Sequence, residues 1–210
     1  MNRRFEQRLS QGIEQLGLVI SAEKQQKLLD YLDLLVKWNG AYNLTAVRDP
    51  EEMLERHLLD SLSVVPYVQG PRLLDVGTGP GLPGIPLAIC FPEIHVTLLD
   101  SNGKKTRFLT QAKMSLRLEN VEVFYGRAEA CRSEPFDQIV SRAFSSLENM
   151  VNWTRHLLAE DGHFLAMKGL HPGEEIEHLP VGFAVKTSHR LDVPSCEGER
   201  HLIIISSQTH

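Results

Sequence analysis

The stretch LDVGTGPGLPG occupies residues 74–84, where it overlaps the end of a short apolar run and leads into a predicted helix. Its four glycines allow the main chain to turn tightly and to approach a ligand without a clash from Cβ atoms. The first N–H groups of the helix are free to bind an anion. We therefore expect this loop to bind a nucleotide, and the alternative is a purely structural turn.

Strands and helices alternate on both sides of this loop. Buried strands are expected at 72–76, 95–100, 121–125, 136–141 and 163–168, and helices at about 84–91, 103–117 and 146–158. This alternation predicts an α/β fold with a mostly parallel sheet and right-handed crossovers. The last two expected strands, 183–193 and 200–206, are separated only by a short loop at 194–198. We expect them to form an antiparallel hairpin at the sheet edge, which completes a seven-stranded sheet.

The first 66 residues differ from the rest because they contain only helical patterns. Helices are expected at about 3–16 and 21–38, the second capped by Ser21, and a third begins at Asp49-Pro50 and ends before Pro66. The chain is therefore expected to divide into an N-terminal helical extension, residues 1–66, packed on an α/β domain, residues 67–210.

The composition is typical of a globular protein in a reducing compartment. Of the 210 residues, 42% are hydrophobic and 23% are charged, which argues against a disordered or fibrous chain. The three cysteines are far apart and support neither a disulfide framework nor a metal site. The sequence shows no export signal and no apolar run of membrane-spanning length. We therefore expect a cytoplasmic protein without a membrane partner, and nothing in the sequence requires more than a monomer.

Charge is unevenly distributed along the chain. The net charge is −5, yet residues 101–117 contain no acid and five basic residues: Lys104, Lys105, Arg107, Lys113 and Arg117. Such a patch can follow nucleic-acid phosphates even in a protein that is acidic as a whole. The alternative, a solvated basic helix face, is the commoner meaning of such a run.

Two kinds of nucleotide fit the glycine loop. Residues 79–84 satisfy the dinucleotide pattern G-x-G-x-x-G, which keeps an NAD-dependent oxidoreductase open as an alternative. The wider pattern Asp75-x-Gly77-x-Gly79-x-Gly81 resembles the first motif of the Rossmann-like, class I methyltransferases that use S-adenosylmethionine. In such an enzyme, the Asp75 carboxylate orients the ammonium group of the methyl donor, directly or through water. The terminal hairpin also favours the methyltransferase sheet over the usual dinucleotide-binding one.

Further positions after the second and third strands fit a bound nucleoside. Asp100 ends the second strand of the domain, where a carboxylate can accept hydrogen bonds from both ribose hydroxyls. This residue would serve NAD equally well, and it is also placed to cap the next helix. Ala128 and Glu129 follow the third strand, where methyltransferases supply contacts to the adenine edge.

The chain as a whole resembles the bacterial small-subunit ribosomal RNA methyltransferase G family. The resemblance covers essentially all 210 residues. It rests on WN at 38–39 with NLT at 43–45, RHLLDS at 56–61, DVGTGPGLPGIP at 75–86, LLDS at 98–101, SRAF at 141–144, KG at 168–169 and GERH at 198–201. One departure is Asn102, where the family more often carries Leu.

The resemblance implies transfer of a methyl group from S-adenosylmethionine to N7 of guanine 527, in the conserved decoding-region loop of 16S rRNA. It implies cofactor contacts from Gly77, Leu82, Ala128, Glu129 and Arg142, to which the patterns above add Asp75, Gly79 and Asp100. Guanine N7 has a lone pair and no proton, so it can attack the methyl group in line without a general base. Catalysis then depends on positioning and electrostatics. The target base should lie in a loop or be splayed out.

The residues expected to face RNA are all basic: Lys104, Lys105, Arg107, Arg127, Lys168 and Arg200. Arg127, Arg142 and Lys168 follow parallel strands and Arg200 opens the last strand, so these four are expected to converge at the ligand edge of the sheet. We expect Arg142 and Arg200 to position the reactants. The alternative is that each cation pairs with a surface acid.

Two polar residues on the third expected helix suggest an anchor. His57 and Asp60 are three positions apart and therefore face the same side of that helix. We expect them to attach the helix to the cofactor-binding domain, and a direct role in RNA binding is the alternative.

Three function classes follow from these patterns. The first is the rRNA methyltransferase, and the second is the NAD-dependent oxidoreductase, for which we find neither a second domain nor a Tyr–Lys or His acid–base set in the sequence. The third is a non-catalytic RNA-binding module that keeps an adenosyl pocket.

Overall fold

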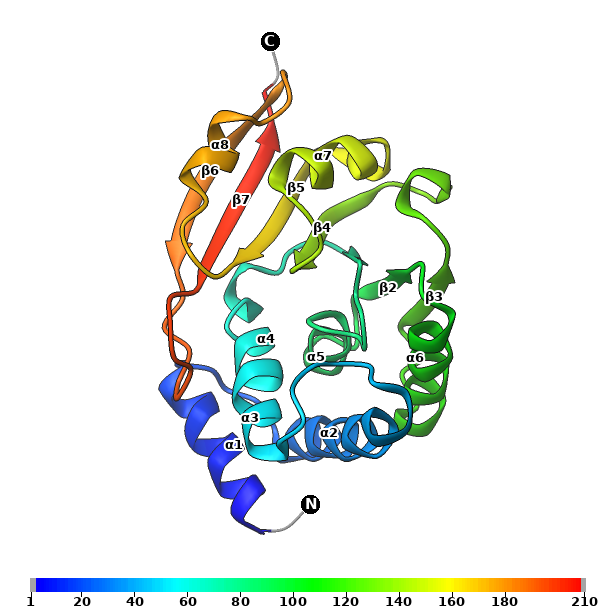
Figure 1. Ribbon diagram of the computed structural model, residues 1–210, viewed down its shortest axis with the longest axis vertical. Helices are drawn as coiled ribbons and strands as arrows, with labels where there is room; N and C mark the ends of the chain where they lie inside the picture. Colours follow the sequence, from blue (N-terminus) through cyan, green and yellow to red (C-terminus); the bar gives the residue numbers. More distant parts are fainter. Residues whose placement is uncertain (1–2, 209–210) are drawn as a thin grey trace.

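The computed structural model describes residues 3–208, and within that range seven strands form one sheet (Figure 1). The strands are β1 (Arg72–Val76), β2 (His95–Asp100), β3 (Val121–Tyr125), β4 (Phe136–Arg142), β5 (Leu158–Lys168), β6 (Phe183–Arg190) and β7 (His201–Ser207). Their order is β3-β2-β1-β4-β5-β7-β6. β1 to β5 run parallel, whereas β7 is antiparallel to both β5 and β6. The predicted sheet and its antiparallel edge hairpin are confirmed.

Helices connect the strands and form the N-terminal region. The α-helices are α1 (Arg3–Gln15), α2 (Ala22–Tyr42), α3 (Pro50–Met53), α4 (Asp60–Leu62), α5 (Gly84–Cys90), α6 (Gly103–Leu116), α7 (Leu147–Thr154) and α8 (Gly173–Glu177). Short 3-10 turns lie at Val65–Tyr67, Ala128–Ala130 and Arg155–Leu157. A π-helical segment, Leu54–Leu59, joins α3 to α4. The third helix expected from the sequence is therefore unbroken but changes its hydrogen-bonding pattern midway.

Successive strand residues enter two different cores, one on each face of the sheet. Leu73 and Leu165 belong to the core that includes α5 and α6, whereas their chain neighbours Leu74 and Phe164 belong to the core that includes α7. Figure 1 shows α5 and α6 on one side of the sheet and α7 and α8 on the other. Because both faces of the sheet are covered, the central strands are mainly apolar, and apolar and polar residues do not alternate along them.

The N-terminal helices complete the larger core and support the glycine loop. α2 packs on α5 and α6, and its Tyr31 and Trp38 rings lie 6.3 and 5.7 Å from the Phe108 ring of α6. The buried Tyr31 hydroxyl donates a 2.8 Å hydrogen bond to the carbonyl of Pro80 in the loop. Since the N-terminal helices and the sheet share one continuous core, the division of the chain at residue 66 stays a prediction.

Several elements differ from the sequence-based expectation. β6 ends at Arg190 and not at residue 193, α7 ends at Thr154 and not at residue 158, and α2 continues to Tyr42, beyond residue 38. β5 begins at Leu158, earlier than expected, because the segment LAEDG at 158–162 continues the strand beside β4 across an irregular pairing. α8 was not predicted, since its five residues are too few to show a helical period.

Asn102 has a local structural role at the start of α6. Its side-chain oxygen accepts hydrogen bonds from the N–H groups of Lys104 (2.9 Å) and Lys105 (3.4 Å). It therefore acts as the N-cap of α6, a role that a leucine side chain has no acceptor to fill.

Replacing Asn102 by Ala is expected to lower the free energy of unfolding by about 1 kcal/mol, because two N–H groups at the start of α6 lose their acceptor. Urea unfolding followed by circular dichroism measures the change. Asn152, exposed in α7, provides the matched control: Asn152→Ala should leave the stability unchanged or raise it slightly. Equal losses in the two variants would contradict the capping role.

Candidate active site

A buried carboxylate closes the glycine loop. Asp75, near the end of β1, has no exposed surface. Its Oδ2 accepts hydrogen bonds from the hydroxyl of Thr78 (2.6 Å) and from the N–H of Gly84 (2.7 Å), the first residue of α5. Both ends of the loop are thereby attached to one strand residue, which sets where the loop turns and where the helix begins.

The contact between Asp75 and Gly84 requires glycine. A Cβ atom at position 84 would lie 2.7 Å from Asp75 Oδ2 and 2.3 Å from a methyl carbon of Leu98. Burial raises the pKa of Asp75 to about 7, although the hydrogen bonds from Thr78 and Gly84 act in the opposite direction. Asp75 therefore acts on the loop itself, and a contact between its carboxylate and the donor's ammonium stays a prediction.

Asp100 connects the end of β2 to the same loop. Its Oδ2 accepts a 2.9 Å hydrogen bond from the N–H of Gly79, and its Oδ1 accepts a 2.8 Å bond from the N–H of Asn102. The Nζ atom of Lys105 lies 4.0 Å from Oδ2. Because a carboxylate oxygen can accept more than one hydrogen bond, Asp100 can still bind a ligand hydroxyl.

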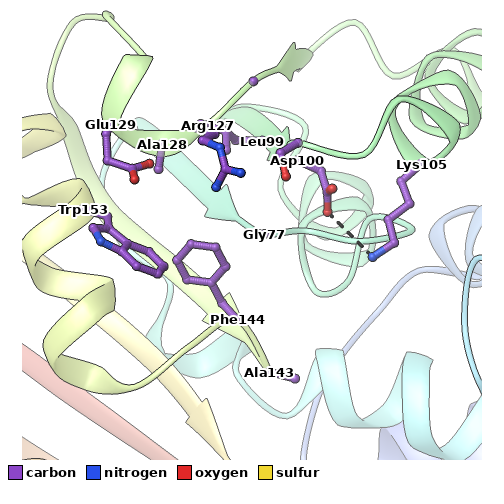
Figure 2. A pocket seen from close by; sticks show the side chains of 12 residues that line it. Gly77, Leu99, Asp100, Lys105, Arg127, Ala128, Glu129, Ala143, Phe144 and Trp153 are labelled. Atoms are coloured by element: carbon purple, nitrogen blue, oxygen red, sulfur yellow. Dashed lines mark ion pairs between the residues drawn. The ribbon is translucent and has the colours of Figure 1, made fainter.

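A cavity of about 230 Å³ lies beyond the carboxyl ends of β1 to β4. This is the switch point of the sheet, because the chain goes from β1 to β2 on one side and later crosses from β3 to β4 on the other side of β1. α/β proteins bind ligands at such points. Figure 2 shows Glu129 and Trp153 on one side, Asp100 and Lys105 on the other, and Phe144 between them. The lining residues are Gly77, Leu99, Asp100, Ser101, Lys105, Gly126, Arg127, Ala128, Glu129, Ala143, Phe144 and Trp153. We call this space the cofactor cavity.

Half of the predicted cofactor residues line this cavity. They are Gly77, Asp100, Ala128 and Glu129. Of the others, Asp75 and Leu82 are buried and Gly79 donates its N–H to Asp100. Arg142 lines a neighbouring cavity. A direct cofactor contact from any of these residues stays a prediction.

Phe144 and Trp153 form an aromatic wall that the sequence reasoning missed. Their rings meet edge to face, with centroids 5.7 Å apart. Phe144 also packs on Gly77, where an added Cβ atom would lie 2.1 Å from its Cδ2. Phe144 lies just beyond β4, so the strand-end rule that selected Arg142 also points to it. Trp153 lies on α7, and nothing in its local sequence indicates that it reaches the cavity.

A second buried carboxylate, Asp60, brings two of the predicted cations together. Its Oδ2 is 2.9 Å from Nη1 of Arg142 and its Oδ1 is 3.2 Å from Nε of Arg200. Asp60 is only 4% exposed. It therefore attaches the N-terminal helical region to β4 and to the segment before β7, and the predicted anchoring role of Asp60 is confirmed.

The four cations expected at the ligand edge separate into two groups. Arg142, Lys168 and Arg200 line one cavity, whereas Arg127 lines the cofactor cavity. Lys168 Nζ lies 2.8 Å from a carboxylate oxygen of Glu175 and donates to the carbonyl of Ser145 at 3.0 Å. Arg142, Lys168 and Arg200 are therefore each paired with an acid, as the alternative reading of the sequence expected. The acid that Arg142 and Arg200 share, Asp60, is buried and does not lie at the surface.

The remaining basic residues lie around α6 and the end of β3. Lys104 and Arg107 are exposed at the start of α6, and Arg127 is exposed at the cavity wall. Lys105 lines the cofactor cavity beside Asp100. Their contact with RNA stays a prediction.

His57 lies in the π-helical segment and is buried. Its Nε2 forms a 2.9 Å hydrogen bond with Oγ1 of Thr45, within the N-terminal region, so the attachment to the sheet comes from Asp60. Burial, and next the positive charge of Arg142, lower the pKa of His57 to about 4.

Residues 3–208 contain neither a metal-binding cluster nor a membrane-spanning helix. No group of three His, Cys, Asp or Glu side chains in that range could hold a metal ion. No helix among these residues is long and apolar enough to cross a membrane.

The sheet order, its antiparallel last strand and the acidic, glycine-rich loop below the cavity define a class I S-adenosylmethionine-dependent methyltransferase. The glycopeptide N-methyltransferase MtfA, solved with S-adenosyl-L-homocysteine, matches with a TM-score of 0.63 and 10% identity over 72% of this chain and 87% of its own. An O-methyltransferase from Bacillus cereus, solved with the same compound, matches with a TM-score of 0.56 and 18% identity. The match covers 85% of this chain and 91% of the Bacillus cereus chain. These likenesses show the fold.

The chain belongs to the rRNA small subunit methyltransferase G family, whose model matches residues 24–203. Ribosomal RNA small subunit methyltransferase G of Pseudomonas aeruginosa strain LESB58 is 62% identical over 199 residues, which cover 94% of this chain and 93% of that protein. The protein of the same name from Ectopseudomonas mendocina strain ymp is 59% identical over 208 residues, 98% and 97% of the two chains. The resemblance stated from sequence is confirmed, and the oxidoreductase alternative is wrong.

The cofactor cavity suits S-adenosylmethionine. Carboxylates of Asp100 and Glu129 stand on opposite sides and can accept hydrogen bonds from the hydroxyl and amino groups of an adenosyl group. The rings of Phe144 and Trp153 offer an apolar surface for a nucleoside. At Gly77 the main chain borders the cavity without a Cβ atom. We expect these residues to hold the cofactor.

Replacing Gly77 by Ala is expected to weaken binding of S-adenosylhomocysteine by about tenfold or more. Its φ of +66° is strained for any residue with a Cβ atom, and that atom would displace Phe144 from the cavity wall. Isothermal titration calorimetry measures the affinity. Gly40→Ala is the matched control because Gly40 lies in α2, where, among residues 3–208, the added carbon meets no atom within 4 Å beyond its chain neighbours and its own helix backbone. Unchanged affinity in the Gly77 variant would contradict the assignment of the cavity.

Acid is expected to destabilise the protein through His57. Between pH 6.5 and 4 the unfolded chain binds a proton at this residue that the native state does not, so stability falls as pH falls. Moving from pH 7 to pH 5 should cost about 2 kcal/mol more in the wild type than in His57→Gln. Urea unfolding at both pH values measures this difference. The exposed His178 is the control, and His178→Gln should keep the wild-type pH dependence.

Proposed function

We propose that the protein transfers the methyl group of S-adenosylmethionine to N7 of guanine 527 in the 16S rRNA of the small ribosomal subunit. The observation that carries the proposal is the 62% identity to a ribosomal RNA small subunit methyltransferase G across 94% of the chain. The geometry of the cofactor cavity, with exposed basic residues beside it, supports the same reaction. This substrate would place the reaction in the cytoplasm.

The chemistry at N7 requires no side chain to accept a proton. S-adenosylmethionine, when bound, supplies a methyl group attached to a positively charged sulfur. The N7 lone pair forms the new N–C bond while the S–C bond breaks, and the electron pair of that bond remains on sulfur. Guanine takes up the positive charge that the sulfur loses. Consistent with this, no His or Cys occurs among the described residues that line the cavity.

The protein's own residues then have to hold, orient and shield the reactants. Asp100 and Glu129 orient the adenosyl group, and the Phe144 and Trp153 rings exclude water from one side of the cavity. Rate enhancement comes from placing N7 at about 3 Å from the methyl carbon in line with the bond that breaks.

RNA binding relies on charge near the cavity. Lys104 and Arg107 at the start of α6 and Arg127 at the cavity wall are exposed and suited to backbone phosphates. N7 lies in the deep groove of a paired RNA helix, which side chains reach poorly, so the target guanine must be unpaired or turned outward.

The proposal predicts that the protein adds one methyl group, to N7 of a single guanine. Purified protein, labelled methyl donor and small-subunit RNA from cells that lack the gene should yield N7-methylguanosine at position 527, detected by borohydride and aniline cleavage. RNA with 7-deazaguanine at that position is the matched control and should accept no label, because carbon replaces N7. Label at another base or another atom would refute the proposed specificity while leaving the methyltransferase class intact.

A further inference from the structure

A second cavity adjoins the cofactor cavity. It has a volume of about 210 Å³. It lies at the carboxyl ends of β4 and β5, beside the first residue of β7. Ala143, the residue after β4, lines both cavities. A group placed in the second cavity therefore meets the cofactor cavity at Ala143.

The walls of the second cavity combine apolar side chains with guanidinium groups. Met167 and Leu191 are nearly buried and supply apolar surface. Arg142 and Arg200 stand at one end, each bonded to a different oxygen of Asp60. Two guanidinium groups share one carboxylate, so this end carries a net positive charge of about one unit.

The guanidinium of Arg200 retains capacity to donate. Its Nε is bonded to Asp60, and Nη1 donates to the carbonyl of Glu199 at 2.7 Å. Within residues 3–208 the partner of Nη2 is the sulfur of Cys196 at 3.7 Å, a weak acceptor that is not among the residues lining the second cavity. A carbonyl oxygen of a ligand would be a better partner for this nitrogen.

We propose that the second cavity receives the target guanine, with its flat face against Met167 and Leu191 and its O6 accepting a hydrogen bond from Arg200. The inference rests on the proposed function and names the subsite of that reaction. Splayed bases are commonly held between apolar side chains and recognised by hydrogen bonds to their edges. N7 then points toward Ala143 and the cofactor cavity, with its lone pair unused by the protein.

This arrangement accounts for a choice of guanine over adenine. Arginine is only a donor, and guanine presents the acceptor O6 where adenine presents an amino group. Asp60 is then a positioning residue, because it holds Arg200 from the N-terminal helical region without touching the base. The competing occupant is the carboxylate of the donor's amino-acid tail, which would also suit the guanidinium groups.

Filling the cavity separates these two occupants. Leu191→Trp should lower methyl transfer to small-subunit RNA by at least about tenfold, because the indole takes the space of the base. The affinity for S-adenosylhomocysteine should stay within about twofold of the wild type. Val181→Trp is the matched control, since Val181 is 97% exposed and lies outside the cavity. Unchanged transfer would overturn the proposal, and a parallel loss of donor affinity would place the donor's tail there instead.

The hydrogen bond to O6 has its own test, which stands even if Leu191→Trp does not fold. RNA with 2-aminopurine at the target position lacks O6 and keeps N7. Removing O6, or replacing Arg200 by Ala, should each lower the transfer rate by about tenfold to a hundredfold. Both changes together should cost no more than either alone. Losses that multiply would show that Arg200 acts without touching O6 and would overturn the contact.

The outcome also distinguishes this proposal from the proposed function. If the wild type places no methyl group on guanine N7, the function and the subsite both fall. If the wild type is active and the two changes at Arg200 and O6 are independent, only the subsite falls. Arg190→Ala, an exposed arginine on β6, serves as the matched control and should retain full activity with both RNAs.

Discussion

The buried carboxylate of Asp75 determines the shape of the glycine loop, and the loop determines the cofactor cavity. Thr78 and Gly84 bond to the same oxygen, so the loop leaves and rejoins the fold at one point. Ionising an acid without exposed surface is costly, which is why burial raises its pKa to about 7. Asp100 at the end of β2 also holds the loop, because its carboxylate accepts a hydrogen bond from the N–H of Gly79. Two strand ends thus hold the loop.

A second constraint joins the N-terminal helices to the reaction site. Asp60 at the start of α4 bonds to Arg142 at the end of β4 and to Arg200 just before β7. Without this carboxylate, the two guanidinium groups would lose the buried acid to which both are bonded. Tyr31 of α2 reaches the carbonyl of Pro80 in the same way. The helical region is therefore part of the site's support and not an appendage.

Much of the fold could be predicted because its signals are local. Short apolar runs mark strands covered on both faces, and the two last strands with no helix between them predict the antiparallel edge. The site was predictable only where it follows directly from a strand end, as for Gly77, Asp100, Ala128 and Glu129. Trp153 on α7 was missed because a side chain's reach across a cavity depends on how its helix packs.

The sequence by itself indicated the class of protein: the pattern from Asp75 to Gly81 resembles the first methyltransferase motif, and the terminal hairpin favours the methyltransferase sheet over the dinucleotide-binding one. Only the tertiary structure decided which charged side chains are already bonded to other protein groups and which remain free to bind a ligand. Asp75 is enclosed by its own loop, Lys168 is held by Glu175, and Arg142 and Arg200 share Asp60. Ion pairs between residues far apart in the chain depend on the packing of helices against the sheet, and no local pattern encodes those distances.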